Sequence, residues 1–148
     1  MNRALVVGGV VALTMGVGTL ARDAAGATQF WGPSQQKFEE SAKGVQRAVV
    51  WGDPATGDYA FLVKYEPGVE RGWHTHSNPL HLVMISGTLV FEVEGSPPQE
   101  LGPGSGVNEA PNVKHNSKCK GNEGCMFLIT GSKYDFKPAR EPVSSAAK

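Results

Sequence analysis

Glycine and proline interrupt this chain too densely for long helices beyond its first 27 residues. The 148 residues include 19 glycines and 10 prolines, and both residue types end helices and initiate turns. The segments between the turns are short, apolar and rich in β-branched or aromatic residues, so we expect strands at residues 45–51, 59–65, 72–76, 80–85, 88–94, 126–130 and 132–136. Their number and shortness predict an all-β fold, an antiparallel sandwich or barrel, and exclude helical bundles and coiled coils.

The expected strand at 88–94 has the alternation that such a fold requires. Leu89, Phe91 and Val93 recur at every second position, which places their side chains on one face of a sheet.

Residues 35–42 are polar apart from one phenylalanine and predict at most a turn of helix.

Residues 1–27 have the pattern of a cleavable secretory signal peptide. Arg3 precedes an uninterrupted run of apolar and small residues at 4–20, and Ala25-Gly26-Ala27 supplies the small-x-small site that signal peptidase recognises. The run approaches the length that spans a bilayer, so a retained membrane anchor is the alternative. We expect cleavage after Ala27, a periplasmic or secreted location, and no membrane contact of the mature protein.

The charge balance excludes one class of partner. Lys and Arg number 14 against 14 Asp and Glu, and the pI is near 6.9, so the chain lacks the basic surplus with which proteins neutralise nucleic-acid phosphates. Cleavage would leave 148 − 27 = 121 residues, the size of one domain. We place that domain at residues 28–138 and a disordered tail at 139–148.

Two cysteines, Cys119 and Cys125, enclose a polar loop of five residues. An exported protein folds in an oxidising compartment, where such a pair can form a disulfide. Two free thiols, or a pair of metal ligands, are the alternatives, but zinc knuckles separate their cysteines by two to four residues. We therefore expect a disulfide that closes a hairpin loop.

The four histidines are concentrated in one part of the chain. His74 and His76 are two residues apart, so on a strand both rings project from the same face and can approach one metal ion. His81 and His115 follow. Neutral imidazoles bind iron, manganese, zinc, nickel and copper, and we predict a divalent transition metal at this cluster. The alternative for each histidine is an ordinary core or surface residue with a hydrogen-bond partner.

The spacing of these histidines resembles the cupin family. Its first motif is Gly, five residues, His-x-His, three or four residues, Glu, six residues, Gly, and its second is Gly, five residues, Pro-x-Gly, two residues, His. The matching residues are Gly68, His74, His76 and Gly87 in the first motif and Gly104 and His115 in the second. The resemblance implies a double-stranded β-helix of the jelly-roll type, a metal held by histidines, and a small-molecule ligand or substrate.

The chain departs from the cupin pattern in three places. Ala110 and Asn112 replace the proline and glycine of the second motif, and the second change is mild because Asn tolerates a positive φ. The glutamate of the first motif is missing, since its place falls on Leu80 or His81. Either His81 points inward as a fourth ligand, which we favour, or three histidines leave positions open for water or substrate.

The remaining expectations concern catalysis. Glu109, or its neighbour Asn108, precedes the turn before His115 and is the candidate acid or base in the cavity; the alternative is a solvated strand residue. The resemblance leaves dioxygenase, isomerase and lyase chemistry open, so the main hypothesis is a metal-dependent enzyme. A non-catalytic periplasmic module that binds or senses a small ligand or metal is the second hypothesis, and a purely structural secreted domain is the third. The sequence leaves a homodimer open.

Overall fold

The computed structural model describes residues 28 and 30–142. The chain divides into residues 1–30 and a compact unit that begins at Trp31, and the fold below is that of the compact unit. The predicted signal peptide, 1–27, and residues 143–148 of the predicted tail lie outside the described residues. Within the part that is described, no helix has the length and apolar composition needed to cross a bilayer.

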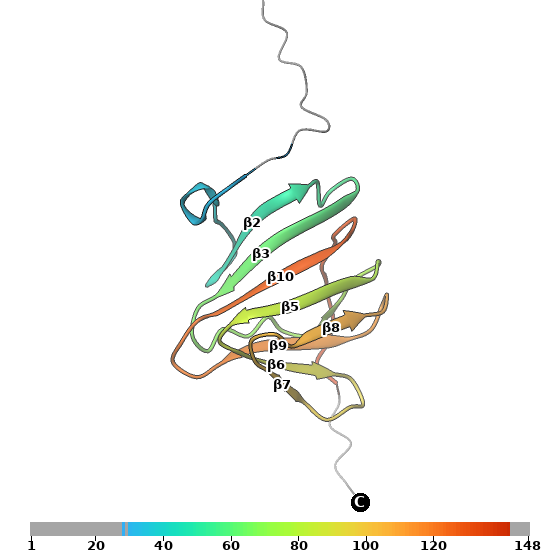
Figure 1. Cartoon of the computed structure of the whole chain (residues 1–148). Helices are drawn as coiled ribbons and strands as arrows, with labels where there is room; N and C mark the ends of the chain where they lie inside the picture. Colours follow the sequence, from blue (N-terminus) through green and yellow to red (C-terminus); the bar gives the residue numbers. More distant parts are fainter. Residues whose placement is uncertain (1–27, 29, 143–148) are drawn as a thin grey trace, which may run out of the picture. The chain divides into compact units, whose positions relative to one another are not determined.

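The compact unit consists of two antiparallel sheets (Figure 1), which confirms the predicted all-β sandwich. A 3₁₀ helix, Pro33–Gln35, precedes the strands. The six-stranded sheet has the order β1 (Glu39–Ala42), β2 (Val45–Gly52), β3 (Asp58–Tyr65), β10 (Cys125–Ser132), β5 (Leu80–Ser86) and β8 (Gly106–Glu109). The five-stranded sheet has the order β11 (Lys137–Pro138), β4 (His74–Thr75), β9 (His115–Lys120), β6 (Thr88–Val93) and β7 (Gln99–Leu101).

Alternating side chains of the two sheets form the core between them. On β6, Leu89 and Phe91 are buried as the sequence predicts. On β5, the buried residues are Leu80, Leu82 and Met84. Because successive side chains of a strand face opposite ways, every residue between these three points outward.

Several strands have no apolar pattern, and the sequence does not predict them. Four of these, β1, β7, β8 and β11, lie at the edges of the two sheets, where one side of the strand lacks a partner and polar residues are tolerated. The fifth, β9, is central, but three of its buried residues are the polar His115, Asn116 and Ser117. Because these buried residues are polar, the strand lacks the apolar alternation from which strands are predicted.

Two predictions at the ends of the domain need correction. No strand forms over 132–136: β10 ends at Ser132, and Lys133 has a φ of 52°, a left-handed conformation that breaks a strand. Residues 39–42 form β1 instead of a turn of helix. Just beyond β11, the Ala139 amide donates to the Trp73 carbonyl at 2.8 Å, and the domain limit at 138 stays a prediction.

Cys119 and Cys125 form a disulfide. It does not close a hairpin, because β9 and β10 belong to different sheets, and it therefore joins the two layers at one end of the sandwich. Gly87, the last glycine of the first motif, lies against it: a Cβ at Gly87 would be 2.5 Å from the Gly124 carbonyl oxygen and 3.1 Å from Cys125 Sγ. With a φ of 76° as well, this position requires glycine.

Removal of the disulfide is expected to weaken the fold without abolishing it. In a Cys119→Ala, Cys125→Ala variant, the short covalent ring no longer restricts the unfolded chain, and we expect the free energy of unfolding to fall by about 2 kcal/mol. Urea unfolding of the variant and of the reduced wild type measures this loss. An unchanged midpoint in both would contradict the expected contribution of the bridge.

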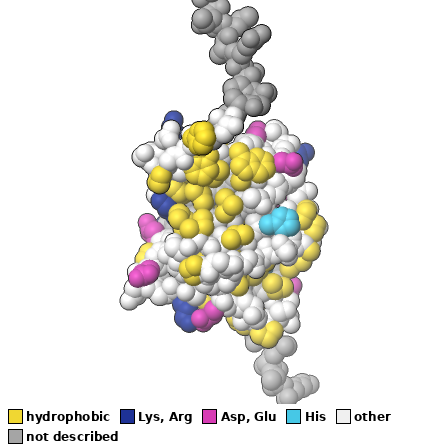
Figure 2. Space-filling model, in the orientation of Figure 1, with side chains coloured by type: hydrophobic (Ala, Val, Ile, Leu, Met, Phe, Trp, Pro, Cys, Tyr) yellow, Lys and Arg dark blue, Asp and Glu magenta, His cyan; other side chains and the backbone are white. Residues whose placement is uncertain are grey.

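The outward face of the six-stranded sheet carries apolar side chains. Figure 2 shows them gathered over β2, β3, β10 and β5, and Trp51, Val83 and Ile85 are among the most exposed large apolar residues. Such a face suits a partner. The homodimer stays a prediction.

Candidate metal centre

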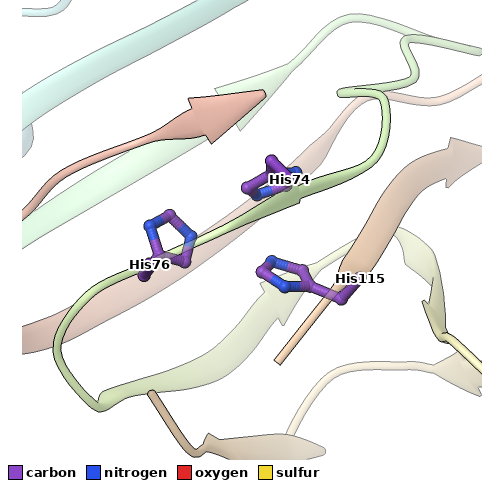
Figure 3. Close-up of side chains that lie close together, drawn as sticks. All are labelled: His74, His76 and His115. Atoms are coloured by element: carbon purple, nitrogen blue, oxygen red, sulfur yellow. The ribbon is translucent and has the colours of Figure 1, made fainter. Parts of the chain in front are cut away.

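Three of the four histidines lie together on the inner side of the five-stranded sheet. His74 begins β4 and His76 follows it two residues later, so both rings project from the same side. His115 begins β9, and its backbone is paired with that of His74. The three rings come from two adjacent strands and face one another (Figure 3).

The three rings are close enough to bind one ion. One ligating atom of each lies within 4.8 Å of those of the other two. The ring centres of His74 and His115 are 4.1 Å apart, and that of His76 is 5.0 Å from His74. All three side chains are buried.

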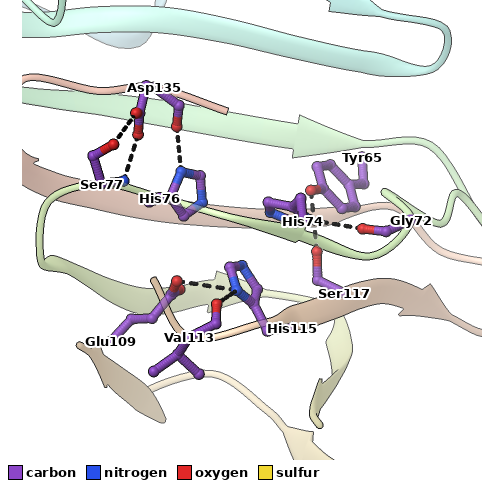
Figure 4. Close-up of polar contacts among 10 residues, drawn as sticks. All are labelled: Tyr65, Gly72, His74, His76, Ser77, Glu109, Val113, His115, Ser117 and Asp135. Carbon is purple, nitrogen blue, oxygen red and sulfur yellow. Dashed lines mark hydrogen bonds and ion pairs between the residues drawn. The ribbon is translucent and has the colours of Figure 1, made fainter. Parts of the chain in front are cut away.

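Backbone carbonyls orient each imidazole through the same nitrogen. Nδ1–H of His74 donates to the Gly72 carbonyl at 2.7 Å, and Nδ1–H of His115 donates to the Val113 carbonyl at 3.1 Å. Nδ1–H of His76 donates to the carbonyl of Asp135 (Figure 4). Because a carbonyl can only accept, each ring carries its proton on Nδ1, which leaves each Nε2 unprotonated and able to bind a metal.

Burial keeps these imidazoles neutral. Desolvation, with the neighbouring His115 as a second cause, lowers the pKa of His74 to about 3. Desolvation likewise lowers the pKa of His115 to about 4 and that of His76 below its ordinary value. Protons therefore do not compete for these nitrogens at neutral pH.

Glu109 lies beside the three histidines. It ends β8 opposite Leu80, on the inward side of the sheet, and is only 6% exposed. Its Oε1 is 3.0 Å from Nδ1 of His115, yet that Nδ1–H points to the Val113 carbonyl, so Oε1 has no hydrogen-bond donor within the described chain. Burial raises the pKa of Glu109 to about 8. Asn108, the alternative candidate, faces outward.

The prediction that His81 points inward is wrong. Leu80 and Leu82 occupy the core, so strand alternation places His81 on the outward face. Its Nδ1 lies 2.8 Å from the side-chain oxygen of Asn108 on the adjacent strand. The buried apolar neighbours decide the orientation, because turning His81 inward would expose two leucines.

The segment after β10 closes one side of the site, and the sequence does not predict it. The Asp135 carbonyl holds His76, and the ring of Phe136 stacks on His74 with 4.2 Å between centres. The Asp135 carboxylate accepts from the Ser77 amide at 2.7 Å, which fastens this segment beside His76. Nothing in the sequence Tyr-Asp-Phe indicates that this segment contacts the histidines.

The turn of the second motif connects with the first motif through the backbone. Asn112 has a φ of 60°, which agrees with its predicted place in a turn. Its amide donates to the His76 carbonyl at 2.7 Å. The turn before His115 is thus hydrogen-bonded to the strand that carries the other two histidines.

Comparisons with known proteins agree with this architecture. A family model described as the ChrR cupin-like domain matches residues 27–134. No protein of curated function matches the chain.

Solved structures of the same fold come from several bacteria. An RmlC-like cupin from Shewanella frigidimarina is 23% identical, with a TM-score of 0.61 over 78% of this chain and 95% of that one. KdgF from Halomonas sp. is 20% identical, with a TM-score of 0.60 over 78% and 97%. The polyketide cyclase RemF from Streptomyces resistomycificus is 14% identical, with a TM-score of 0.67 over 78% and 88%. At these identities the likeness shows the fold alone.

Proposed function

The chain belongs to the ChrR cupin-like family of the cupins, and we propose that it is an exported metal-dependent enzyme acting on a small molecule. His74, His76 and His115 would hold a divalent transition metal. The observation that carries the proposal is the shared orientation of these rings: each Nδ1–H is bonded to a backbone carbonyl, which leaves every Nε2 unprotonated in a cluster whose ligating atoms lie within 4.8 Å of one another.

The donor set fits such a metal. Neutral imidazole suits iron, manganese, zinc, nickel and copper, and burial keeps all three rings neutral. Glu109 adds a buried carboxylate oxygen without a partner, whose charge a cation nearby would offset. When bound, the metal would supply Lewis-acid chemistry or activation of oxygen, the chemistry of lyases, isomerases and dioxygenases.

Glu109 is the residue placed to move a proton. Its carboxyl is buried beside His115, and its raised pKa leaves it partly protonated near neutral pH. A group with such a pKa can both accept and donate a proton. We therefore propose Glu109 as the acid or base of the reaction.

The proposed location outside the cytoplasm has independent support. The buried disulfide between Cys119 and Cys125 is of a kind that persists in oxidising compartments. Together with the signal-like segment at 1–27, it supports a periplasmic or secreted protein. The balance of 14 basic and 14 acidic residues supports a small molecule, not a nucleic acid, as the partner we propose.

A non-catalytic module that binds or senses a small ligand is the second candidate. The cavity next to the histidines is small, about 30 Å³, which is room for about two water molecules. That size favours a tightly held ion over a large substrate. Turnover of any small molecule by the metal-loaded protein would separate the enzyme from this alternative.

Metal analysis tests the proposal. Protein purified after export to a bacterial periplasm is expected to contain about one transition-metal ion per chain, because ligand binding stabilises the folded state. Inductively coupled plasma mass spectrometry measures the ratio and identifies the metal. A content at background, with no uptake when iron, manganese, zinc, nickel or copper is added, would show that the proposed function is wrong.

A further inference from the structure

Three adjoining hollows lie between the surface and the histidines. The innermost is the histidine cavity, whose lining includes Arg71, Tyr65 and Tyr134. A second hollow of about 20 Å³ shares these three residues and adds Arg47. The outermost is an open groove of about 430 Å³ that again includes Arg47. The shared lining residues show that neighbouring hollows adjoin one another, and we call the three together the passage.

Two arginines stand where these hollows meet. Arg47 belongs to β2, and its guanidinium carbon lies 5.1 Å from the ring centre of Tyr134. Arg71 lies just before β4, with its guanidinium carbon 3.9 Å from the ring centre of Phe136. Both side chains are partly buried, and the cation–π contacts with the aromatic rings help to hold the guanidiniums at these positions.

Neither guanidinium has a polar partner within the described residues. No carboxylate lies within ion-pair distance of Arg47 or Arg71, and neither side chain donates a hydrogen bond among residues 30–142. Glu39 and Glu40 line the open groove with Arg47 but form no ion pair with it. A guanidinium has five N–H donors, and a cation–π contact uses none of them.

Partly buried, oriented and unpaired guanidiniums are suited to bind an anion. Their planar N–H groups match a carboxylate in a two-point contact. The positive charge of both arginines faces the passage, whereas the neutral histidines and Glu109 lie at its inner end. An anionic ligand would therefore be attracted at the arginines and present its other end to the histidines.

We propose that Arg47 and Arg71 form a carboxylate-binding subsite, so that the substrate is a small organic carboxylate. The inference rests on the proposed function, because it places the far end of that molecule at the histidine triad. The inner hollows, about 20 and 30 Å³, leave room only for the smallest groups of such a molecule, and the rest of it would extend into the open groove of about 430 Å³. The two arginines bind and orient; they take no part in a bond-making step.

Calorimetric titration with malonate tests this subsite in metal-free protein, where the histidines cannot contribute a metal contact. Malonate is expected to bind the wild type, and neutral malonamide is not. Arg47→Gln and Arg71→Gln should each weaken malonate binding about tenfold to a hundredfold, the usual effect of a hydrogen bond to a charged group. Arg140→Gln removes an exposed arginine away from the passage and should bind malonate like the wild type.

Further arms separate the alternatives. Arg47→Lys and Arg71→Lys keep the charge and should retain more affinity than the glutamine variants, which guards against a loss that reflects misfolding. Equal binding by wild type and both glutamine variants, or equal loss in Arg140→Gln, would overturn the subsite. Inorganic phosphate binding tighter than malonate would overturn the assignment to a carboxylate.

Failure of the subsite and failure of the metal proposal can be told apart. If malonate binding depends on the arginines but the protein takes up no metal, the subsite stands and the proposed function fails. If the protein holds metal but malonate affinity is the same in the wild type and in both glutamine variants, the proposed function stands and the subsite fails.

Discussion

Replacement of His115 by alanine is expected to weaken transition-metal binding by at least about a hundredfold, more than the loss of an outer-shell partner causes. His115 contacts both other histidines, with ring centres 4.1 Å from His74 and 5.3 Å from His76. Its removal leaves two ligating nitrogens from one strand and none from β9. Metal affinity, measured by competition with a chromophoric chelator, checks the expected loss.

His81→Ala is the matched control for this experiment. It removes an imidazole of the same chemistry from the same motif, but one that lies on the outward face and bonds to Asn108. The variant should therefore bind metal like the wild type. A loss in His81→Ala equal to that in His115→Ala would contradict the three-histidine site. The unfolding midpoint of both metal-free variants shows whether either change acts through the fold.

Glu109→Gln is expected to stabilise the metal-free protein at high pH. The amide keeps the size of the side chain but removes a charge that burial disfavours. In the wild type, the pKa of Glu109 is about 8 in the folded protein against an ordinary 4.5. Between these values the folded state binds the extra proton, so wild-type stability falls as pH rises from 4.5 to 8.

The size and pH range of this effect are measurable. Near pH 4 the variant and the wild type should have the same free energy of unfolding. The variant's value should exceed the wild type's by a growing amount up to pH 8, and by a constant amount above pH 8. The shift corresponds to at most about 5 kcal/mol, and relaxation of the surroundings of the ionised carboxylate reduces our expectation to about 2–3 kcal/mol. Urea unfolding in the presence of a chelator, at pH 4, 6 and 9, measures the difference. A variant less stable than the wild type at pH 9 would contradict it.

Glu109→Gln should weaken metal binding although it stabilises the metal-free protein. A cation beside the ionised carboxylate offsets the cost of its burial, so the wild type gains more from the metal than Glu109→Gln does. By linkage the variant should bind metal about tenfold more weakly. Equal metal affinities of the wild type and the variant would show that the Glu109 carboxylate does not interact with the ion.

The class of fold was predictable because it depends on local signals. Turn residues separate short strands, and the alternation of Leu89 and Phe91 on β6 follows directly from strand geometry. The pair His74 and His76 was predictable for the same reason. In β9, by contrast, polar side chains are buried at the site, and no local pattern distinguishes them from solvated ones.

The orientation of His81 shows where a motif misleads. Its place near the missing glutamate suggested a ligand, whereas the burial of Leu80 and Leu82 turns it outward. One step along a strand exchanges the faces of the sheet. Either the two leucines or the histidine can face the core, but not both. Burying the two leucines contributes more free energy than placing one imidazole inward, so the leucines face the core.

The sequence by itself determined an all-β cupin domain and placed two histidines side by side, because turns and strand alternation act between neighbouring residues. The cupin motifs already pointed to His115 and the sequence offered Glu109 as a cavity residue, but only the tertiary structure decided their positions, supplied the carbonyls that orient all three rings, and set Arg47 and Arg71 beside the hollows. Those residues come from five separate stretches of chain. Their meeting depends on how the two sheets pack, which is a property of the entire core and not of any one segment.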